Sequence, residues 1–128
     1  MALGKQVNEF SLKSTSSTLT AGPGKTIKFE TNFEGSFKGD VGEGTGVGTL
    51  TVVAEQGSKS GLWEWCGVLF LKGGGAISDR GHGTWHETGP GKWRYRGAGE
   101  TSEGALYAVE SEHDLATRTL AGKSYEWT

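Results

Sequence analysis

The sequence predicts an all-β protein, and within that class a single-domain, eight-stranded antiparallel up-and-down barrel. Extended segments follow one another at short intervals, separated by Gly, Ser and Asp, and no stretch keeps a helical apolar period. The 128 residues include 23 glycines, two prolines, five Trp, five Phe and three Tyr, which suits twisted strands joined by tight turns. Eight consecutive strands with short links close most simply as an up-and-down barrel. The interior of such a barrel is either filled or able to hold one small ligand.

The first strand is expected at residues 4–12, followed by a polar Ser/Thr stretch at 14–20 and a turn at 21–25. The second strand, residues 25–38, shows the clearest alternation of apolar and polar side chains. Its apolar face consists of Ile27, Phe29, Phe33 and Phe37. A strand of this kind buries one face in the core and leaves the other in solvent.

The third strand, residues 40–55, carries glycine at every second position and then becomes apolar in the same phase. The glycines are Gly42, Gly44, Gly46 and Gly48, and the apolar residues are Leu50, Val52 and Ala54. A glycine column allows a close approach, either by a crossing strand at a coiling barrel corner or by a ligand, and the corner is the simpler explanation. A phosphate loop is excluded, because the Gly-Lys-Ser/Thr ending and the following helix are missing.

The fourth strand, residues 61–72, is apolar on both sides and is the element around which the rest of the chain is arranged. One face carries Leu62, Glu64, Cys66, Val68 and Phe70, and the other carries Trp63, Trp65, Leu69 and Leu71. Both faces are therefore expected to be largely buried, the outer one against a partner subunit or a covering segment. Which face points inward stays open, because a shift of one residue in register exchanges the two sets.

The last four strands are expected at residues 76–88, 92–100, 105–114 and 117–127. Aromatic side chains recur on one face of each strand. In the fifth strand, Asp79 shares its face with Ile77 and Trp85.

Glu64 is the candidate catalytic residue. If its face points inward, its carboxylate lies among apolar groups, where desolvation favours the protonated form and suits a general acid or base near neutral pH. Two alternatives are a buried ion pair with Arg94 or Arg96, and a solvent-facing position between two Trp residues.

Cysteine and histidine give weaker candidates. Cys66 lies on the same face as Glu64, either as a nucleophile or, more simply, as a small buried hydrophobe. His82 and His86 cannot share one metal ion, because a spacing of four on a strand separates them by roughly 13 Å. His113 is isolated, so no metal site is predicted.

Aromatic side chains are the candidate ligand-binding residues. Each one taken singly is explained by packing, but Trp and Tyr together also line pockets that hold flat or hydrophobic molecules. The predicted set is Phe29, Phe33, Trp63, Trp65, Cys66, Trp85, Trp93, Tyr95 and Tyr107.

A family resemblance follows from three motifs: Asn-Phe-Glu-Gly-Ser-Phe-Lys-Gly at 32–39, Gly-Thr-Gly-Val-Gly at 44–48, and His-Gly-Thr-Trp at 82–85 with a Gly-Pro-Gly link at 89–91. Residues 32–127 thereby resemble the allene-oxide-cyclase barrel-like group, above all its small bacterial members. The resemblance implies an eight-stranded, calycin-like barrel with a cavity, often oligomeric. Its plant relatives are cofactor-free cyclases that hold a hydrophobic substrate in a reactive conformation. A complete cyclase catalytic set is not matched in this chain.

Composition and charge limit the classes of partner that the protein is expected to bind. The formal net charge is −2 without a basic patch, so nucleic acid is not an expected partner. One cysteine cannot form an internal disulfide, the N-terminal residues lack an apolar signal core, and no run approaches the roughly 20 apolar residues of a membrane helix. We therefore expect a cytoplasmic protein without a membrane partner.

Together these observations predict a barrel that binds a small hydrophobic molecule, with a cofactor-free cyclase or isomerase as the sharper hypothesis. Confinement of a substrate removes competing conformers, so such an enzyme needs few polar residues. The alternatives are a non-catalytic carrier of hydrophobic ligands and a structural homo-oligomer. In the homo-oligomer, Trp63 and Trp65 would pack across a subunit interface.

Overall fold

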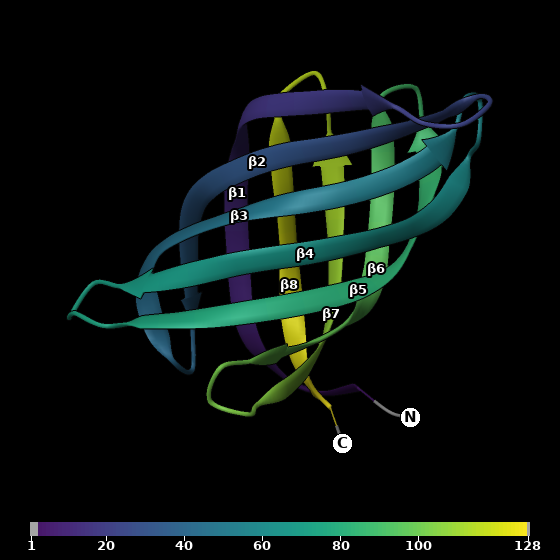
Figure 1. The fold of residues 1–128 in the computed structure, drawn as a ribbon. Helices are drawn as coiled ribbons and strands as arrows, with labels where there is room; N and C mark the ends of the chain where they lie inside the picture. Colours follow the sequence, from purple (N-terminus) through teal and green to yellow (C-terminus); the bar gives the residue numbers. More distant parts are fainter. Residues whose placement is uncertain (1–2, 128) are drawn as a thin grey trace.

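Eight antiparallel strands close into one barrel in sequence order in the computed structural model, which describes residues 3–127 (Figure 1). The strands are β1 (Leu3–Ala21), β2 (Thr26–Gly39), β3 (Gly42–Glu55), β4 (Ser60–Leu71), β5 (Ala76–Gly89), β6 (Lys92–Thr101), β7 (Leu106–Asp114) and β8 (Thr119–Trp127). Each strand pairs with its neighbours in sequence, and β1 pairs with β8 to complete the ring. The predicted all-β up-and-down barrel is confirmed. Between residues 3 and 127, no helix has the length and apolar character needed to cross a membrane.

The last seven strands lie within two residues of their predicted bounds, but the prediction for β1 is wrong. The Ser/Thr stretch continues β1 and pairs with β2 as far as Ala21 opposite Ile27, after a bulge between Ser14 and Ser16. Hydroxyl and amide side chains support this pairing, since Asn32 Nδ2 donates to Ser16 Oγ at 3.0 Å. The stretch extends beyond the β8 ladder, which ends at Lys13, so it buries little and lacks an apolar alternation.

The two faces of β4 are now assigned. Trp63 points into the barrel and is 5% exposed, whereas Leu62 points outward and is 69% exposed. The expectation that both faces are buried is wrong for this single chain, because Phe70 on the outer face is also half exposed. The alternation in β2 is as predicted, with Phe33 and Phe37 buried inside.

Glycines on the inner wall provide space for the aromatic rings of neighbouring strands. An added Cβ at Gly48 would overlap the ring of Trp65, and one at Gly67 would lie 2.6 Å from its Nε1. On β6, a Cβ at Gly97 would lie 2.7 Å from Trp63 Cζ2. The glycine column of β3 therefore accommodates an interior tryptophan. Near the start of the same glycine column, a Cβ at Gly44 would overlap the main chain of β4. This close approach of two strands agrees with the predicted coiling corner of the barrel.

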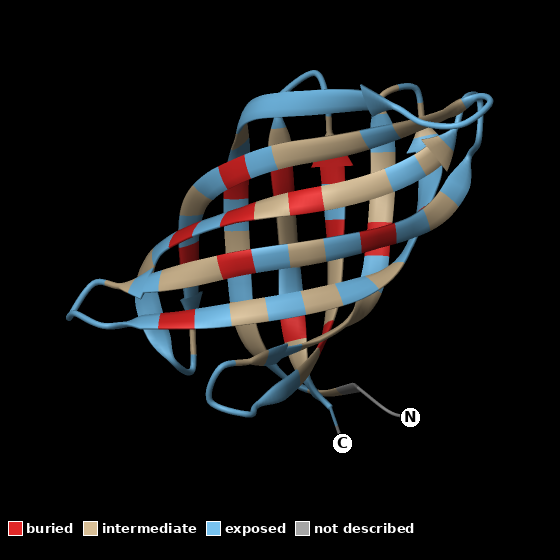
Figure 2. Ribbon diagram, viewed as in Figure 1, coloured by how far each residue is buried: buried red, intermediate tan, exposed pale blue. Residues whose placement is uncertain are grey.

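The centre of the barrel is filled by a cluster of large side chains. It consists of Leu12, Phe33, Leu50, Trp63, Trp85, Tyr95 and Leu120. Trp63 and Tyr95 meet edge to face, with ring centroids 6.2 Å apart, and Trp63 Nε1 donates to the carbonyl oxygen of Thr84 at 3.0 Å. Figure 2 shows buried positions mainly along the middle of the strands and exposed ones at the hairpins. The cluster therefore fills the waist and leaves space towards both ends.

Candidate functional site

Two cavities lie on either side of the filled waist. The terminus-end cavity, about 330 Å³, lies at the end of the barrel that holds both chain termini, and its lining includes Phe10, Phe37, Leu69, Ile77, Asp79 and Tyr107. The far-end cavity, about 390 Å³, is lined by residues that include Phe29, Val52, Trp85, Trp93 and His113. Leu50 and Tyr95 border both cavities and form part of the wall between them.

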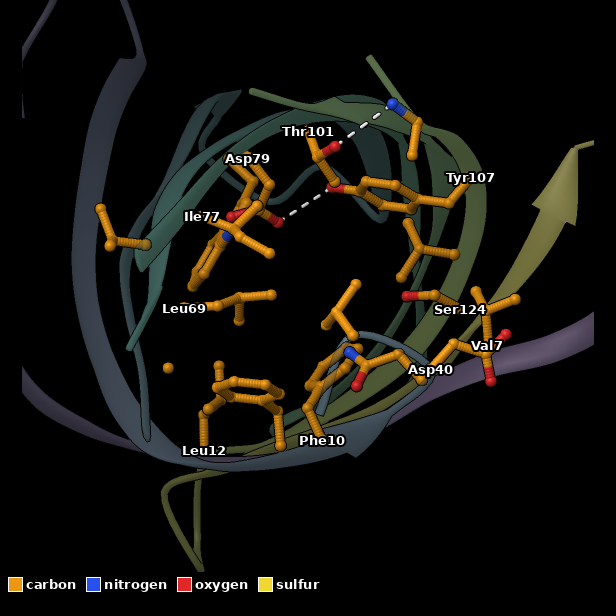
Figure 3. A pocket seen from close by; sticks show the side chains of 18 of the residues that line it. Val7, Phe10, Leu12, Asp40, Leu69, Ile77, Asp79, Thr101, Tyr107 and Ser124 are labelled. Carbon is orange, nitrogen blue, oxygen red and sulfur yellow. Dashed lines mark hydrogen bonds between the residues drawn. The ribbon is translucent and has the colours of Figure 1, made fainter. Parts of the chain in front are cut away.

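Asp79 and Tyr107 form a hydrogen-bonded polar pair in the mainly apolar terminus-end cavity (Figure 3). The alternation of β5 places Asp79 inside, in phase with Ile77. Tyr107 comes from β7 and reaches across β6, where an added Cβ at Gly99 would lie 2.5 Å from Tyr107 Cζ. The Tyr107 hydroxyl donates a hydrogen bond of 3.0 Å to Asp79 Oδ2. The missing side chain at Gly99 thus allows two non-adjacent strands to share this bond.

The Asp79 carboxyl is only partly satisfied by the protein. Its Oδ1 is buried without a hydrogen-bond partner, and none of the ion pairs of the described chain involves it. Burial raises the pKa of Asp79, opposed first by the hydrogen bond from Tyr107 and then, less strongly, by the Trp65 side chain and by the main chain of Asp79 itself. Burial, with the negative charge of Asp79, also raises the pKa of Tyr107. The phenol therefore keeps its proton and acts as the donor of the pair.

The charged groups that line the terminus-end cavity are all acidic. Besides Asp79 they are Asp40, in the β2–β3 hairpin, and Glu126, near the end of β8, and both are exposed. Lys5 Nζ lies 3.3 Å from Asp40 Oδ2, in a pair whose side chains are both more than half exposed. An exposed pair of this kind is weak and screened by salt. The cavity therefore presents negative charge to a ligand.

The far-end cavity contains His113, which packs between aromatic rings. Its ring centroid lies 5.3 Å from those of both Phe33 and Trp93. Both ring nitrogens are buried without a hydrogen-bond partner in the protein. Burial lowers the pKa of His113, against the opposing charge of Asp114. The imidazole is thus held neutral, at the cost of an unsatisfied N–H.

The predicted catalytic residue lies outside the barrel. Glu64 is exposed on the outer wall, opposite Thr51 and His82 in the two ladders. Its face points away from the cavities, so the apolar environment on which its proposed acid–base role depended is absent. The alternative ion pair with Arg94 or Arg96 is also absent, since no ion pair among residues 3–127 involves Glu64, and Arg94 Nη2 lies 3.1 Å from Glu112 Oε1 instead. Of the three possibilities, the solvent-facing position is the one observed.

Cys66 also faces outward and is exposed, so it is neither a cavity residue nor a buried hydrophobe. Most of the predicted aromatic residues do border a cavity. Trp63, Trp65 and Tyr107 line the terminus-end cavity, Phe29, Trp85 and Trp93 line the far-end cavity, and Tyr95 borders both. Phe33 is 1% exposed and belongs to the filled waist.

Asp79 and His113 are the site residues that sequence reasoning missed. Asp79 could have been found, because a carboxylate in phase with Ile77 and Trp85 on a barrel strand must point inward. His113 likewise alternates in phase with Tyr107 and the other inward residues of β7.

Comparisons of the chain with protein-family models, with curated proteins and with solved structures found no match. The resemblance to the allene-oxide-cyclase barrel-like group therefore stays a prediction. Among residues 3–127, no group of three or more His, Cys, Asp or Glu side chains is placed to hold a metal ion.

Proposed function

We propose that this protein binds a small, mostly apolar molecule in the terminus-end cavity. The observation that carries the proposal is a cavity of about 330 Å³ with apolar walls and one convergent polar pair, Asp79 and Tyr107. Small-molecule sites have this composition: hydrophobic side chains supply affinity, and a few polar groups fix the orientation of the ligand. The exposed thiol of Cys66 fits a reducing compartment, so we include a cytoplasmic location in this proposal.

The fold supports binding by pre-organisation. The cavity walls belong to strands paired on both sides, and Tyr107 is already hydrogen-bonded to Asp79. A ligand therefore does not have to order these groups when it binds, which reduces the entropy cost of association. The binding free energy also gains roughly 25 cal/mol for each Å² of apolar surface that the ligand and the cavity remove from water.

Tryptophan fluorescence tests this proposal, because Trp63 and Trp65 line the cavity. A panel of small hydrophobic compounds, including polyunsaturated and polyketide-like ones, is titrated into the protein. Saturable quenching by at least one class supports binding. A flat response to every class would show that the cavity does not bind such molecules.

A cofactor-free cyclase or isomerase is the second candidate function, now centred on Asp79. A carboxyl that is buried in a mainly apolar cavity, and whose pKa is raised by that burial, is a candidate for proton transfer to or from a bound substrate. Asp79→Asn would then lose turnover while it keeps binding, and Glu64→Gln, on the outer wall, would keep both. Saturable binding without a product would instead favour the non-catalytic carrier.

A further inference from the structure

We propose that the ligand of the terminus-end cavity is a small apolar amine, whose protonated nitrogen lies against the carboxyl of Asp79. The inference rests on the proposed function and specifies the chemical class of the ligand. It is carried by the charges of the cavity and by the incomplete hydrogen bonding of one side chain.

The charges of the lining select against anions. Asp79, Asp40 and Glu126 line the cavity, and none of the lining residues is Lys, Arg or His. A fatty acid or another carboxylate would meet like charge there and no cation to pair with. A protonated amine is attracted by the exposed carboxylate of Glu126 and by Asp79, whereas Asp40 shares its charge with Lys5 in an exposed pair.

The hydrogen bonding of Asp79 selects for a donor. A carboxylate can accept about four hydrogen bonds, yet among residues 3–127 Tyr107 supplies the one side-chain hydrogen bond to Asp79, and Oδ1 is buried there without a partner. A buried charge left this incompletely compensated is unfavourable. An ammonium group supplies both the missing positive charge and N–H donors. An alcohol supplies one neutral donor, and a carboxylate supplies none.

The remaining walls select for an apolar body. Leu69 and Ile77 lie beside Asp79, and Val7, Phe10 and Leu12 line the opposite side of the cavity (Figure 3). Phe37 also lines it. A highly hydrated polyamine would lose its hydration along these walls without compensation. One amine on a hydrocarbon or aromatic skeleton satisfies both parts of the cavity.

Three probes of equal chain length separate charge from hydrophobicity: octylamine, 1-octanol and octanoate. Each is titrated into the wild-type protein and into Asp79→Asn at pH 7.5, with Glu64→Gln, which removes a carboxylate on the outer wall, as the control. We expect octylamine to bind wild type about tenfold more tightly than octanol, and octanoate to bind weakest. In Asp79→Asn the advantage of octylamine over octanol should disappear, while octanol binds as in wild type. Glu64→Gln should keep that advantage in full.

The outcomes distinguish this inference from the proposed function. Equal binding of octylamine and octanol to wild type, or tightest binding of octanoate, would overturn the amine and leave the binding function in place. If none of the three probes binds, while the wider compound panel does, the inference is again overturned. If nothing in either set binds, the proposed function fails as well.

A measurement on wild type covers the case in which Asp79→Asn does not fold. The titratable groups that line the cavity are Asp79, Tyr95, Tyr107, Asp40 and Glu126, and burial keeps both phenols protonated at pH 7.5 and below. Burial raises the pKa of Asp79, so its carboxylate takes up a proton as the pH falls and then no longer attracts the ammonium group. Octylamine should therefore lose its advantage over octanol as the pH is lowered from 7.5 to 4. An advantage that is constant over this range would contradict the pairing with Asp79.

Discussion

The hydroxyl of Tyr107 donates a hydrogen bond of 3.0 Å to Asp79 Oδ2, although β6 lies between the strands that carry them. The bond crosses β6 at Gly99, which pairs directly with Tyr107. Three strands thus cooperate to place one polar pair in the terminus-end cavity.

Gly99→Ala is expected to destabilise the protein and displace Tyr107. The new Cβ would lie 2.5 Å from Tyr107 Cζ and would overlap the carbonyl oxygen of Arg80, so the ring or the strand has to move. Overpacking of this kind costs about 1–3 kcal/mol, measurable by urea unfolding. Gly73→Ala is the matched control, since a Cβ there meets no atom within 4 Å. Equal losses in both variants would show that the contact with Tyr107 is unimportant.

Tyr107→Phe should raise the pKa of Asp79 further. The Tyr107 hydrogen bond favours the ionised carboxylate and is the largest of the effects that lower this pKa, so its removal leaves burial less opposed. The loss of one buried hydrogen bond should also cost about 1 kcal/mol. Carboxyl-carbon NMR of Asp79 measures the change in pKa. Tyr125→Phe removes a hydrogen bond to Glu110 instead and should leave the Asp79 titration unchanged.

His113→Leu is expected to stabilise the protein, and more so in acid. The substitution removes two buried nitrogens that have no partner. The pKa of His113 is lower in the folded than in the unfolded chain, so the unfolded chain takes up its proton first as the pH falls below about 6.5. The free energy of unfolding of wild type therefore falls as the pH drops below this value. The variant lacks the imidazole, so it does not lose stability through this proton uptake.

Thermal unfolding at pH 8 and pH 5 measures this difference. The advantage of His113→Leu over wild type should be larger at pH 5. His82→Leu, at an exposed position on the outer wall, is the control and should change the pH dependence little. If His113→Leu is less stable than wild type at both pH 8 and pH 5, the His113 nitrogens must have hydrogen-bond partners, for example buried water molecules.

Gly46→Leu is expected to abolish binding in the terminus-end cavity with little loss of stability. A Cβ at Gly46 makes only ordinary contacts, the nearest at 3.5 Å from Leu69 Cδ2, so a larger side chain extends into the cavity. Ala54→Leu, on the inner face of the same strand, fills the far-end cavity instead and is the matched control. Fluorescence titration should show binding in the control alone. The reverse result would place the ligand at the far end.

If the protein forms a homo-oligomer, we expect side chains other than the predicted ones at its subunit interface. Trp63 and Trp65 point into the barrel, so the expectation that they form an interface is wrong. The outer face of β4 instead exposes Leu62 and Phe70. Light scattering should give a mass above that of one chain for wild type and a lower mass for a Leu62→Ser, Phe70→Ser variant. A monomeric mass for wild type would end this prediction.

The barrel was predictable because the alternation of Phe29, Phe33 and Phe37 is local information, and strand ends follow from glycine turns. The orientation of β4 was harder to predict, because period 2 defines two faces without saying which is inside. Gly48 and Gly67 indicate which face of β4 points inward, because they leave space for a ring on the face that carries Trp65. The pairing of Tyr107 with Asp79 depends on how three strands curve around the cavity, and this curvature is not encoded in any one strand.

Leu50, Trp63 and Tyr95 belong to the filled waist, so the barrel is not a conduit from one end to the other. A molecule that enters beside Asp40 must leave by the same mouth. If the proposed function holds, exchange of ligands at the terminus end would be dissociative: the occupant would depart before a successor binds, and its residence time would set the rate of exchange. Access to one mouth therefore controls both loading and release.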